Sequence, residues 1–301
     1  MIDVIIIGGG PAGVAAANYA RARGLEVLLF EKNRIGGLIT LTTIVSHYPG
    51  LDTDESGESF GIKLEEQLNS NDTKVIFEKV EKVELEGEIK TVYTSNSKYE
   101  AKTIIIATGS EPKLPPIDKT DGYLIKPNVY EKIADAKDKE VFVLGGSDGA
   151  CKEAISLARY ARRVHIVQNQ NALLTIHEFK EQIENNDKFI VHTSSELESL
   201  KVDKDEITEV NIIDIVTGKV KQYADGPYLV FAYIGQTPNS SLFIDLLEME
   251  DGYIKSDGIR TSIPGVYSCG DINVKEMRQI STAVSDGTLA GIEAYNYIRK
   301  G

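Results

Sequence analysis

The stretch IDVIIIGGGPAGVAAANYARARGLEVLLFE, residues 2–31, decides the fold. It begins with DVIII, a run rich in β-branched residues that is typical of a buried parallel strand. The glycine-rich turn GGGPAG follows at residues 8–13, and an alanine-rich segment then runs with helical character to Gly24. A second apolar run, EVLLF, ends at Glu31. Strand, turn, helix and strand in this order predict the β-α-β unit of a dinucleotide-binding domain.

The glycines of this turn explain how it would bind a pyrophosphate. Gly8, Gly10 and Gly13 permit a tight turn and a close approach to the helix N-terminus, whose free N–H groups and dipole favour an anion. Glu31 is placed to accept hydrogen bonds from ribose hydroxyls. Strand, turn, helix, second strand and acid occur in the expected order, so a dinucleotide site is favoured over a glycine-rich turn in some other α/β protein. The predicted contacts of this site are Gly8, Gly10, Pro11, Ala12, Gly13 and Glu31.

Composition excludes several classes of protein. The chain has 301 residues, enough for two domains, and a formal net charge of −13, which would repel nucleic acid. No apolar run approaches the roughly 20 residues of a membrane helix. The N-terminus is interpreted as a strand and not as a targeting signal. These features indicate a cytoplasmic protein without nucleic-acid or membrane partners, and no metal site is predicted.

Two later segments favour FAD over NAD at the first loop. They are TIIIATGS (103–110) and GVYSCGDI (265–272), each a strand that ends in a small-residue turn. With GGGPAG they resemble the two-dinucleotide-domain flavoprotein reductases. RIGGLITLTTIVSHYPG (34–50), YIGQTPN (233–239) and MRQISTAVSDGTLAGIEAYNYI (277–298) narrow the resemblance to low-molecular-weight thioredoxin reductases. It covers nearly the whole chain and implies an α/β fold of two Rossmann-like, three-layer ββα domains, the second inserted in the first.

The resemblance also implies the domain boundaries and the FAD contacts. Residues 1–117 and 241–301 would form the FAD domain and residues 118–240 the inserted domain. The proline-rich SEPKLPPI (110–117) would cross between them and has little helix or strand potential. Asp271 would bind the ribityl or phosphate part of FAD. The segment KVIFEKV (74–80) would be a strand that places Val80 against the adenine. The other implied FAD contacts are Lys32, Gly37, Leu38, His47, Ala107, Thr108, Gly109, Gly270, Arg278, Gln279 and Ile280.

The second domain repeats the β-α-β pattern with EVFVLGG (140–146), a helix to Tyr160 and RVHIVQ (163–168). Its loop GGSDGA departs from the first at Ser147, which adds a Cβ and a hydroxyl near the phosphate. The strand then ends in QNQN (168–171), where the family has the cations that bind a 2′-phosphate. NADH is therefore expected over NADPH, and a second flavin or an empty site remain open alternatives. The predicted contacts of this site are Gly145, Gly146, Ser147, Asp148 and Gln168.

The cysteines change the expected chemistry. The chain has only Cys151 and Cys269, so it lacks the CxxC pair that relays electrons in thioredoxin reductases. Cys151 follows a helix start and is either a thiolate with a lowered pKa or a small buried residue. Cys269 is expected to be buried. His47 is either a proton donor at the flavin or the cap of a turn.

The favoured function is an FAD oxidoreductase that exchanges electrons with a donor or acceptor, such as NADH or ferredoxin, without a dithiol relay. The alternatives are a disulfide reductase that uses Cys151 alone and a flavin-binding redox sensor without turnover. Arg159, Arg162 and Arg163, at helix spacing in ARYARR, either stabilise a helix C-terminus or form a basic patch for an acidic carrier such as ferredoxin or flavodoxin. Some relatives without CxxC are ferredoxin–NAD(P) reductases of thioredoxin-reductase type. A homodimer is implied by the resemblance only.

Overall fold

The chain folds into two compact units, each with its own largely parallel sheet. The computed structural model describes residues 1–117 and 124–300. Unit 1 comprises residues 1–40, 44–111 and 237–301, and unit 2 comprises residues 41–43 and 112–236.

The chain passes between the units along two short strands. β7 (Ser110–Pro112) and β15 (Gln236–Pro238) pair as a two-stranded sheet. A strand therefore forms at the start of a segment in which little strand potential is expected, because residues far along the sequence supply the hydrogen-bonding partner that a strand needs. The chain changes units after residues 111 and 236, a few residues before the expected boundaries at 117 and 240. Residue 118, the expected start of the second domain, lies outside the described residues.

Unit 1 is built on a seven-stranded sheet of order β3-β2-β1-β6-β5-β4, with β18 also paired to β6. β1, β2, β3, β18 and the end of β6 are parallel, whereas β4 and β5 extend the sheet in antiparallel fashion. The single strand expected over residues 74–80 is wrong, since it is divided into β3 and the start of β4. The bounds are β1 Ile2–Ile7, β2 Val27–Phe30, β3 Lys74–Ile76, β4 Val80–Glu84, β5 Lys90–Thr94, β6 Lys98–Ile106 and β18 Val266–Ser268.

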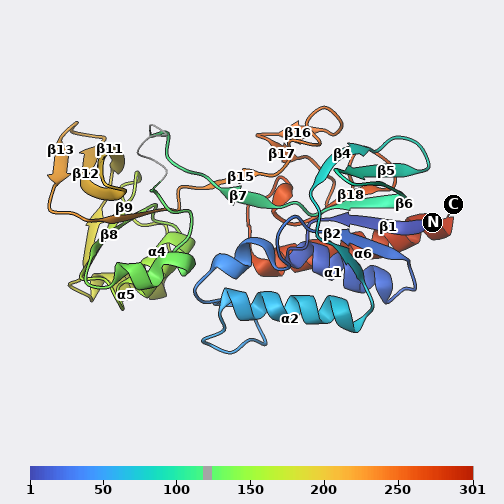
Figure 1. Ribbon diagram of the computed structural model, residues 1–301, viewed down its shortest axis with the longest axis horizontal. Helices are drawn as coiled ribbons and strands as arrows, with labels where there is room; N and C mark the ends of the chain where they lie inside the picture. Colours follow the sequence, from blue (N-terminus) through green and yellow to red (C-terminus); the bar gives the residue numbers. More distant parts are fainter. Residues whose placement is uncertain (118–123, 301) are drawn as a thin grey trace. The chain divides into compact units, whose positions relative to one another are not determined.

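Three helices cover one face of this sheet: α1 (Pro11–Arg21), α2 (Gly57–Ser70) and α6 (Ile280–Lys300) (Figure 1). Two glycines of α6 allow it to lie directly on α1. A Cβ at Gly287 would lie 2.0 Å from the carbonyl oxygen of Ala12, and one at Gly291 would lie 2.5 Å from that of Ala16. The last helix thereby fixes the helix that follows the first glycine-rich loop. No helix in the described ranges is both long and apolar enough to cross a membrane.

The opposite face of the unit 1 sheet carries a second core, and several short elements complete the unit, η1 on the helix-covered side. Alternate residues of β1 point to the two faces, so that Ile6 joins the helix-covered core while Ile5 and Ile7 join the other. The short elements are η1 Gly37–Leu41, β16 Met249–Glu250, β17 Tyr253–Ile254 and η3 Gly270–Ile272.

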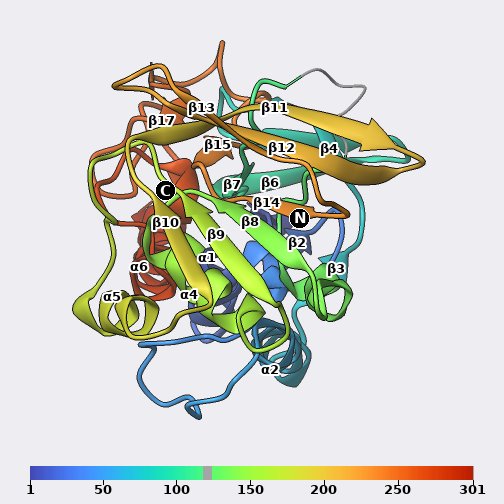
Figure 2. The same ribbon diagram turned by 90° about the vertical axis from the view of Figure 1, so that its left-hand side faces the viewer.

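Unit 2 has a parallel sheet of order β10-β9-β8-β14. α4 and α5 cover one face, and the antiparallel sheet β11-β12-β13 covers the other (Figure 2). The helix expected to reach Tyr160 ends at Leu157. The bounds are β8 Glu140–Leu144, α4 Asp148–Leu157, β9 Arg163–Val167, α5 His177–Glu184, β10 Phe189–His192, β11 Ser195–Asp203, β12 Glu206–Asp214, β13 Val220–Tyr223 and β14 Leu229–Ala232, with η2 at Tyr130–Ala136 before β8.

Candidate functional site

The first glycine-rich loop joins the carboxyl end of β1 to α1, the edge of a parallel sheet where ligands bind. Gly8 has a φ of +110°, and a Cβ there would lie 2.3 Å from the carbonyl oxygen of Ala107. A Cβ at Gly13 would lie 1.9 Å from the carbonyl oxygen of Gly8. At Gly10, by contrast, a Cβ would meet no atom within 4 Å. Gly8 and Gly13 are thus required for packing, whereas Gly10 keeps an open space in front of the helix.

The N-terminus of α1 faces this space without a side-chain cap. Gly10 is the N-cap residue, Pro11 occupies the first turn, and no acidic residue lies in that turn. The first N–H groups of a helix have no partner within the helix, and the dipole makes this end positive. The loop therefore has the chemistry of an anion site, which fits a pyrophosphate.

Glu31 follows β2 and is held in a fixed orientation beside the loop. Its side chain is buried, Oε2 accepts a hydrogen bond from the Gly9 N–H at 2.8 Å, and Oε1 accepts one from the Asn33 N–H at 2.8 Å. Each carboxylate oxygen has two acceptor sites, so each can accept one further hydrogen bond. Lys32, the next residue, is exposed.

Segments distant in sequence meet at the start of α1. The Gly36 N–H donates to the Gly9 carbonyl oxygen at 2.8 Å, and a Cβ at Gly37 would lie 3.5 Å from the Gly10 Cα. A Cβ at Gly270 would lie 2.9 Å from the Ala12 Cβ. Together with Glu31 and Ala107, Gly37 and Gly270 bring four of the predicted contact segments to this one loop.

The other predicted FAD contacts of unit 1 range from buried to exposed. Thr108 is held by Asn239, with the Thr108 Oγ1 donating to the Asn239 carbonyl oxygen at 2.9 Å, and a Cβ at Gly109 would meet open space. His47 is exposed and has a φ of +59°. Val80 is buried in the core on the sheet face opposite the helices. Leu38 lies half-buried in η1, and Gln279 and Ile280 lie at the start of α6.

Asp271 and Arg278 carry polar atoms that the protein leaves unsatisfied. Asp271 Oδ1 is buried without a hydrogen-bond partner, and burial raises the pKa of this carboxyl group, while Lys275 and Arg278 oppose the rise. The Arg278 guanidinium lies 4.1 Å from the centre of the Tyr253 ring, and its Nε is also buried without a partner. Buried polar groups in native proteins are normally hydrogen-bonded. The acid and the cation therefore fit a polar ligand such as the ribityl-phosphate portion of FAD.

Unsatisfied buried atoms of this kind are confined to unit 1. Within residues 1–117 and 124–300, six buried side-chain atoms have no hydrogen-bond partner, and all six belong to unit 1. They are Glu55 Oε1, Glu78 Oε2, Ser268 Oγ, Asp271 Oδ1, Asn273 Oδ1 and Arg278 Nε.

The loop of unit 2 repeats the backbone geometry of the first loop. Gly145 has a φ of +114°, and a Cβ there would lie 2.3 Å from the carbonyl oxygen of Tyr233. Ser147 has φ −80° and ψ 175°, close to the −72° and 179° of Gly10, and it too is a helix N-cap residue without a side-chain cap bond. The Ser147 side chain therefore occupies the space that Gly10 leaves open. Asp148 is tied to the segment after β9, because its Oδ1 accepts from Thr175 Oγ1 at 3.0 Å and from the Ile176 N–H at 2.9 Å.

Gln168 takes the position in unit 2 that Glu31 has in unit 1. Its side chain is buried, a Cβ at Gly146 would lie 3.0 Å from Gln168 Nε2, and Gln168 Oε1 accepts from the Asn169 N–H at 3.1 Å. The Leu174 N–H donates to the Gly146 carbonyl oxygen at 2.8 Å, and the Leu174 side chain is 63% exposed. The segment QNQNALLTI, residues 168–176, contains no charged residue, so this edge of the loop has neither a carboxylate for a ribose nor a cation for a 2′-phosphate.

Both cysteines are fully buried. Burial raises the pKa of Cys151 to about 11 and also raises that of Cys269. A nucleophilic thiol needs access and a lowered pKa. Cys151 has neither, so the structure matches the small-residue interpretation and gives no support to a reactive thiolate.

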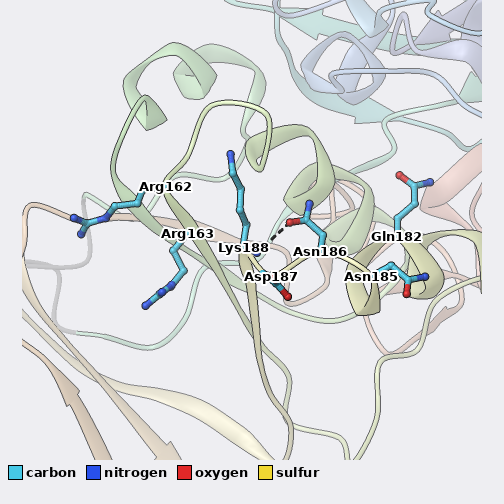
Figure 3. A pocket seen from close by; sticks show the side chains of 7 residues that line it. All are labelled: Arg162, Arg163, Gln182, Asn185, Asn186, Asp187 and Lys188. Atoms are coloured by element: carbon cyan, nitrogen blue, oxygen red, sulfur yellow. Dashed lines mark hydrogen bonds between the residues drawn. The ribbon is translucent and has the colours of Figure 1, made fainter.

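The three arginines do not share a helix as expected, because α4 ends at Leu157. Arg162 and Arg163 line a hollow of about 650 Å³ with Lys188 (Figure 3). Both arginines also pair with Glu140, at 3.4 and 3.7 Å. The end of α4 is instead stabilised by Lys188, whose Nζ donates to two carbonyl oxygens there. Arg163 begins β9, so this hollow lies at the amino edge of the sheet, opposite the edge that carries the nucleotide loop.

Comparisons with known proteins agree with this architecture. A family model described as pyridine nucleotide-disulphide oxidoreductase matches residues 2–287. The chain is 35% identical to a thioredoxin reductase of Peptoclostridium acidaminophilum, covering 98% of this chain and 96% of that protein. It is 34% identical to a 34.2 kDa protein in the rubredoxin operon of Clostridium pasteurianum, covering 99% and 97%. The crystal structure of Lactococcus lactis thioredoxin reductase in its FR conformation matches with a TM-score of 0.95 at 31% identity, over 100% of both chains.

Proposed function

The chain belongs to the pyridine nucleotide-disulphide oxidoreductase family, and we propose that it is an FAD-dependent oxidoreductase that passes electrons between donor and acceptor without a dithiol relay. The observation that supports this most directly is a contrast within the molecule. Unit 1 has a loop, an acid and unsatisfied polar atoms suited to FAD, whereas the two cysteines, Cys151 and Cys269, are buried and far apart in the sequence. FAD, when bound, takes up electrons in pairs and releases them singly or in pairs, so no protein thiol is needed.

Different residues of unit 1 would bind different parts of FAD. The N–H groups at the start of α1 would bind the pyrophosphate, and Glu31 would accept hydrogen bonds from the adenosine ribose. Asp271 would accept from the ribityl hydroxyls, and Arg278 would balance phosphate charge. The positive end of α6, which follows Gln279, would stabilise negative charge on the flavin ring.

The pyridine nucleotide of this enzyme is NADH in our proposal, and its site is the loop of unit 2. NADPH carries a 2′-phosphate, and residues 168–176 offer no cation to bind it. Gln168 is a neutral side chain beside Gly146, suited to the uncharged ribose hydroxyls of NADH. Ser147 reduces the space for the pyrophosphate, so the affinity for NADH is modest. A second flavin or an empty site at this loop is the alternative.

The second electron partner is a small acidic one-electron carrier in this proposal. Ferredoxin and flavodoxin fit the chemistry of the flavin, and the Clostridium pasteurianum relative, described as a protein in a rubredoxin operon, adds rubredoxin as a carrier to test. The hollow at Arg162 and Arg163 is an unfavourable place for electron transfer, because it lies at the sheet edge opposite the nucleotide loop. A homodimer is part of the proposal and is tested by sedimentation of the purified protein.

The decisive experiment follows the flavin under anaerobic conditions. The purified yellow protein is mixed separately with NADH, NADPH, reduced ferredoxin and reduced rubredoxin, and bleaching of the flavin band near roughly 450 nm is recorded. Rapid bleaching by NADH and slow bleaching by NADPH is the expected result. Bleaching by a carrier alone would assign the loop of unit 2 to another ligand. No bleaching by any donor would support a redox sensor, and failure to bind FAD would overturn the proposal.

A further inference from the structure

A largely buried ion pair in unit 1 holds the turn that carries Asp271. Asp286, in the second turn of α6, accepts two hydrogen bonds at its Oδ2, one from the Gly270 N–H at 3.0 Å and one from Lys275 Nζ. The side chains of Lys275 and Asp286 are only 15% and 21% exposed. Because Asp271 directly follows Gly270, the bond to the Gly270 N–H fixes the backbone next to this carboxyl group.

The same turn of α6 also holds Gly270 by packing. Gly270 has a φ of +80°, and a Cβ there would lie 2.9 Å from the Ala12 Cβ and 3.8 Å from the Ala283 Cβ. A Cβ at Gly287 would lie 2.0 Å from the Ala12 carbonyl oxygen. Ala283, Asp286 and Gly287 lie within one helical turn of each other and share a face of α6. That face therefore joins the first turn of α1 to the Gly270 turn.

The charged groups around Asp271 balance one another. Burial raises the pKa of the Asp271 carboxyl group. Lys275 and Arg278 oppose this rise, whereas Asp286 adds to it, so all three charges act on this group. Two carboxylates and two cations have no net charge together. Removing Lys275 alone would leave a net negative charge, which is unfavourable for an anionic ligand such as the diphosphate of FAD.

We propose that Lys275 is a positioning residue for Asp271 and acts through Asp286. While the ion pair is intact, Asp286 holds the Gly270 N–H, and the unpaired Oδ1 of Asp271 keeps one orientation toward a hydroxyl of the ligand. Without the lysine, the Asp286 carboxylate would turn toward water, because a partly buried charge without its partner is costly. The inference rests on the proposed FAD site of unit 1 and adds two residues that act through Asp271.

Binding of FAD to the apoprotein tests this role. Fluorescence titrations give the dissociation constants of the wild type, Lys275→Met, Asp271→Asn and the double variant. We expect Lys275→Met to weaken FAD binding about tenfold in the wild-type background and less than about twofold in the Asp271→Asn background. Equal losses in the two backgrounds would overturn the proposal, as would equal FAD affinity in Lys275→Met and the wild type.

Two further variants separate this ion pair from a general effect of charge. Arg260→Met is the matched control, because Arg260 pairs with Glu293 of the same helix, with Nη2 2.7 Å from Oε2. Glu293 lies about two turns beyond Asp286, and the FAD dissociation constant of Arg260→Met should stay within about twofold of the wild type. Lys275→Arg keeps a cation beside Asp286 and should bind FAD within about threefold of the wild type. A tenfold loss in Lys275→Arg would contradict the role of the charge.

Folding and cofactor binding are measured separately. Hydrogen exchange of the Gly270 amide in the apoprotein, followed by NMR, reports the bond to Asp286 without any cofactor. It should become at least about tenfold faster in Lys275→Met, and unchanged exchange would overturn the proposal. If Lys275→Met does not fold, Lys275→Gln, which keeps a polar donor without the charge, replaces it in every measurement. A wild-type protein that does not bind FAD would refute the proposed function, whereas the Gly270 exchange would still decide whether Lys275 holds the turn.

Discussion

The two glycine-rich loops have nearly the same backbone and different side-chain chemistry. Gly8 and Gly145 approach a carbonyl oxygen equally closely, 2.3 Å for a Cβ in each case, and Gly10 and Ser147 share one backbone conformation. Yet all six unsatisfied buried atoms of the described residues belong to unit 1. Backbone packing thus gives both loops the same shape, and the two loops differ by one Cβ, one charge and a few unpaired polar atoms.

The largest expected effect comes from adding a methyl group at Gly13, where the first loop has no room for a Cβ, whereas the second loop already has Ala150 at the matching position. Gly13→Ala would place a Cβ 1.9 Å from the Gly8 carbonyl oxygen, so the loop must shift. We expect a loss of about 3 kcal/mol in the free energy of unfolding and a protein purified without flavin. The matched change in unit 2 is Ala150→Gly, which costs about 1 kcal/mol through helix propensity. Urea unfolding and the flavin absorbance check both, and full stability with bound FAD in Gly13→Ala would break the comparison.

Exchanging the residue types at Gly10 and Ser147, the matching N-cap positions of the two loops, should change the nucleotide affinity of each loop in opposite directions. Gly10→Ser meets no protein atom, so the fold should persist while FAD binding weakens about 10- to 100-fold through crowding of the pyrophosphate. Ser147→Gly should strengthen NADH binding about tenfold. Fluorescence titrations of the apoprotein with FAD and of the holoprotein with NADH measure these changes. Equal FAD affinity in Gly10→Ser and the wild type would show that the open space is not the phosphate site.

Asp271→Asn should affect the apoprotein and the holoprotein in opposite directions. The buried carboxylate has an unpartnered oxygen and a raised pKa, so its replacement should stabilise the apoprotein by about 1 kcal/mol near neutral pH. The two apoproteins should become equally stable below the ordinary aspartate pKa of about 3.9 and diverge as the pH rises, because a raised pKa disfavours the charged form. FAD affinity should fall about tenfold. If the Asp271→Asn apoprotein were less stable than the wild-type apoprotein, Asp271 would already have a partner in unit 1.

The smallest expected effect concerns Cys151→Ser. The thiol is fully buried with a pKa of about 11, so the rate of flavin reduction by the effective donor should remain unchanged. Burying a hydroxyl in an apolar core should cost about 1–2 kcal/mol in the free energy of unfolding. Stopped-flow reduction and thermal unfolding report the two quantities. Loss of turnover with FAD retained would restore the disulfide reductase hypothesis.

Local patterns explain how much of this architecture could be predicted from the sequence. Both β-α-β units were predictable, because a glycine at positive φ followed by an amphipathic segment leaves a visible pattern, as at Gly8 and Gly145. The burial of Cys269 also agrees with the expectation from residue type, and the burial of Cys151 matches one of the two alternatives for it. The strand β7 was missed because its partner β15 lies more than 100 residues further along the chain.

The side-chain clusters were beyond sequence reasoning for the same physical reason. The contacts of Arg278 with Tyr253 and of His165 with His192 join separate strands and loops, and no periodicity in the chain brings them together. The second histidine of that pair ends an ordinary short strand, β10, and carries no motif. Only the sheet register places its ring beside β9.

The late return of the chain to unit 1 has a consequence for protein synthesis. β18 and α6 complete unit 1, and both are translated after the whole of unit 2. At about 5–20 residues per second, residues 237–301 add about 3 to 13 seconds, during which unit 2 is complete and the α1 face lacks its partner helix. The nascent chain therefore finishes the second loop before the first, and the apolar surface of α1 is the segment that a chaperone at the ribosome would meet.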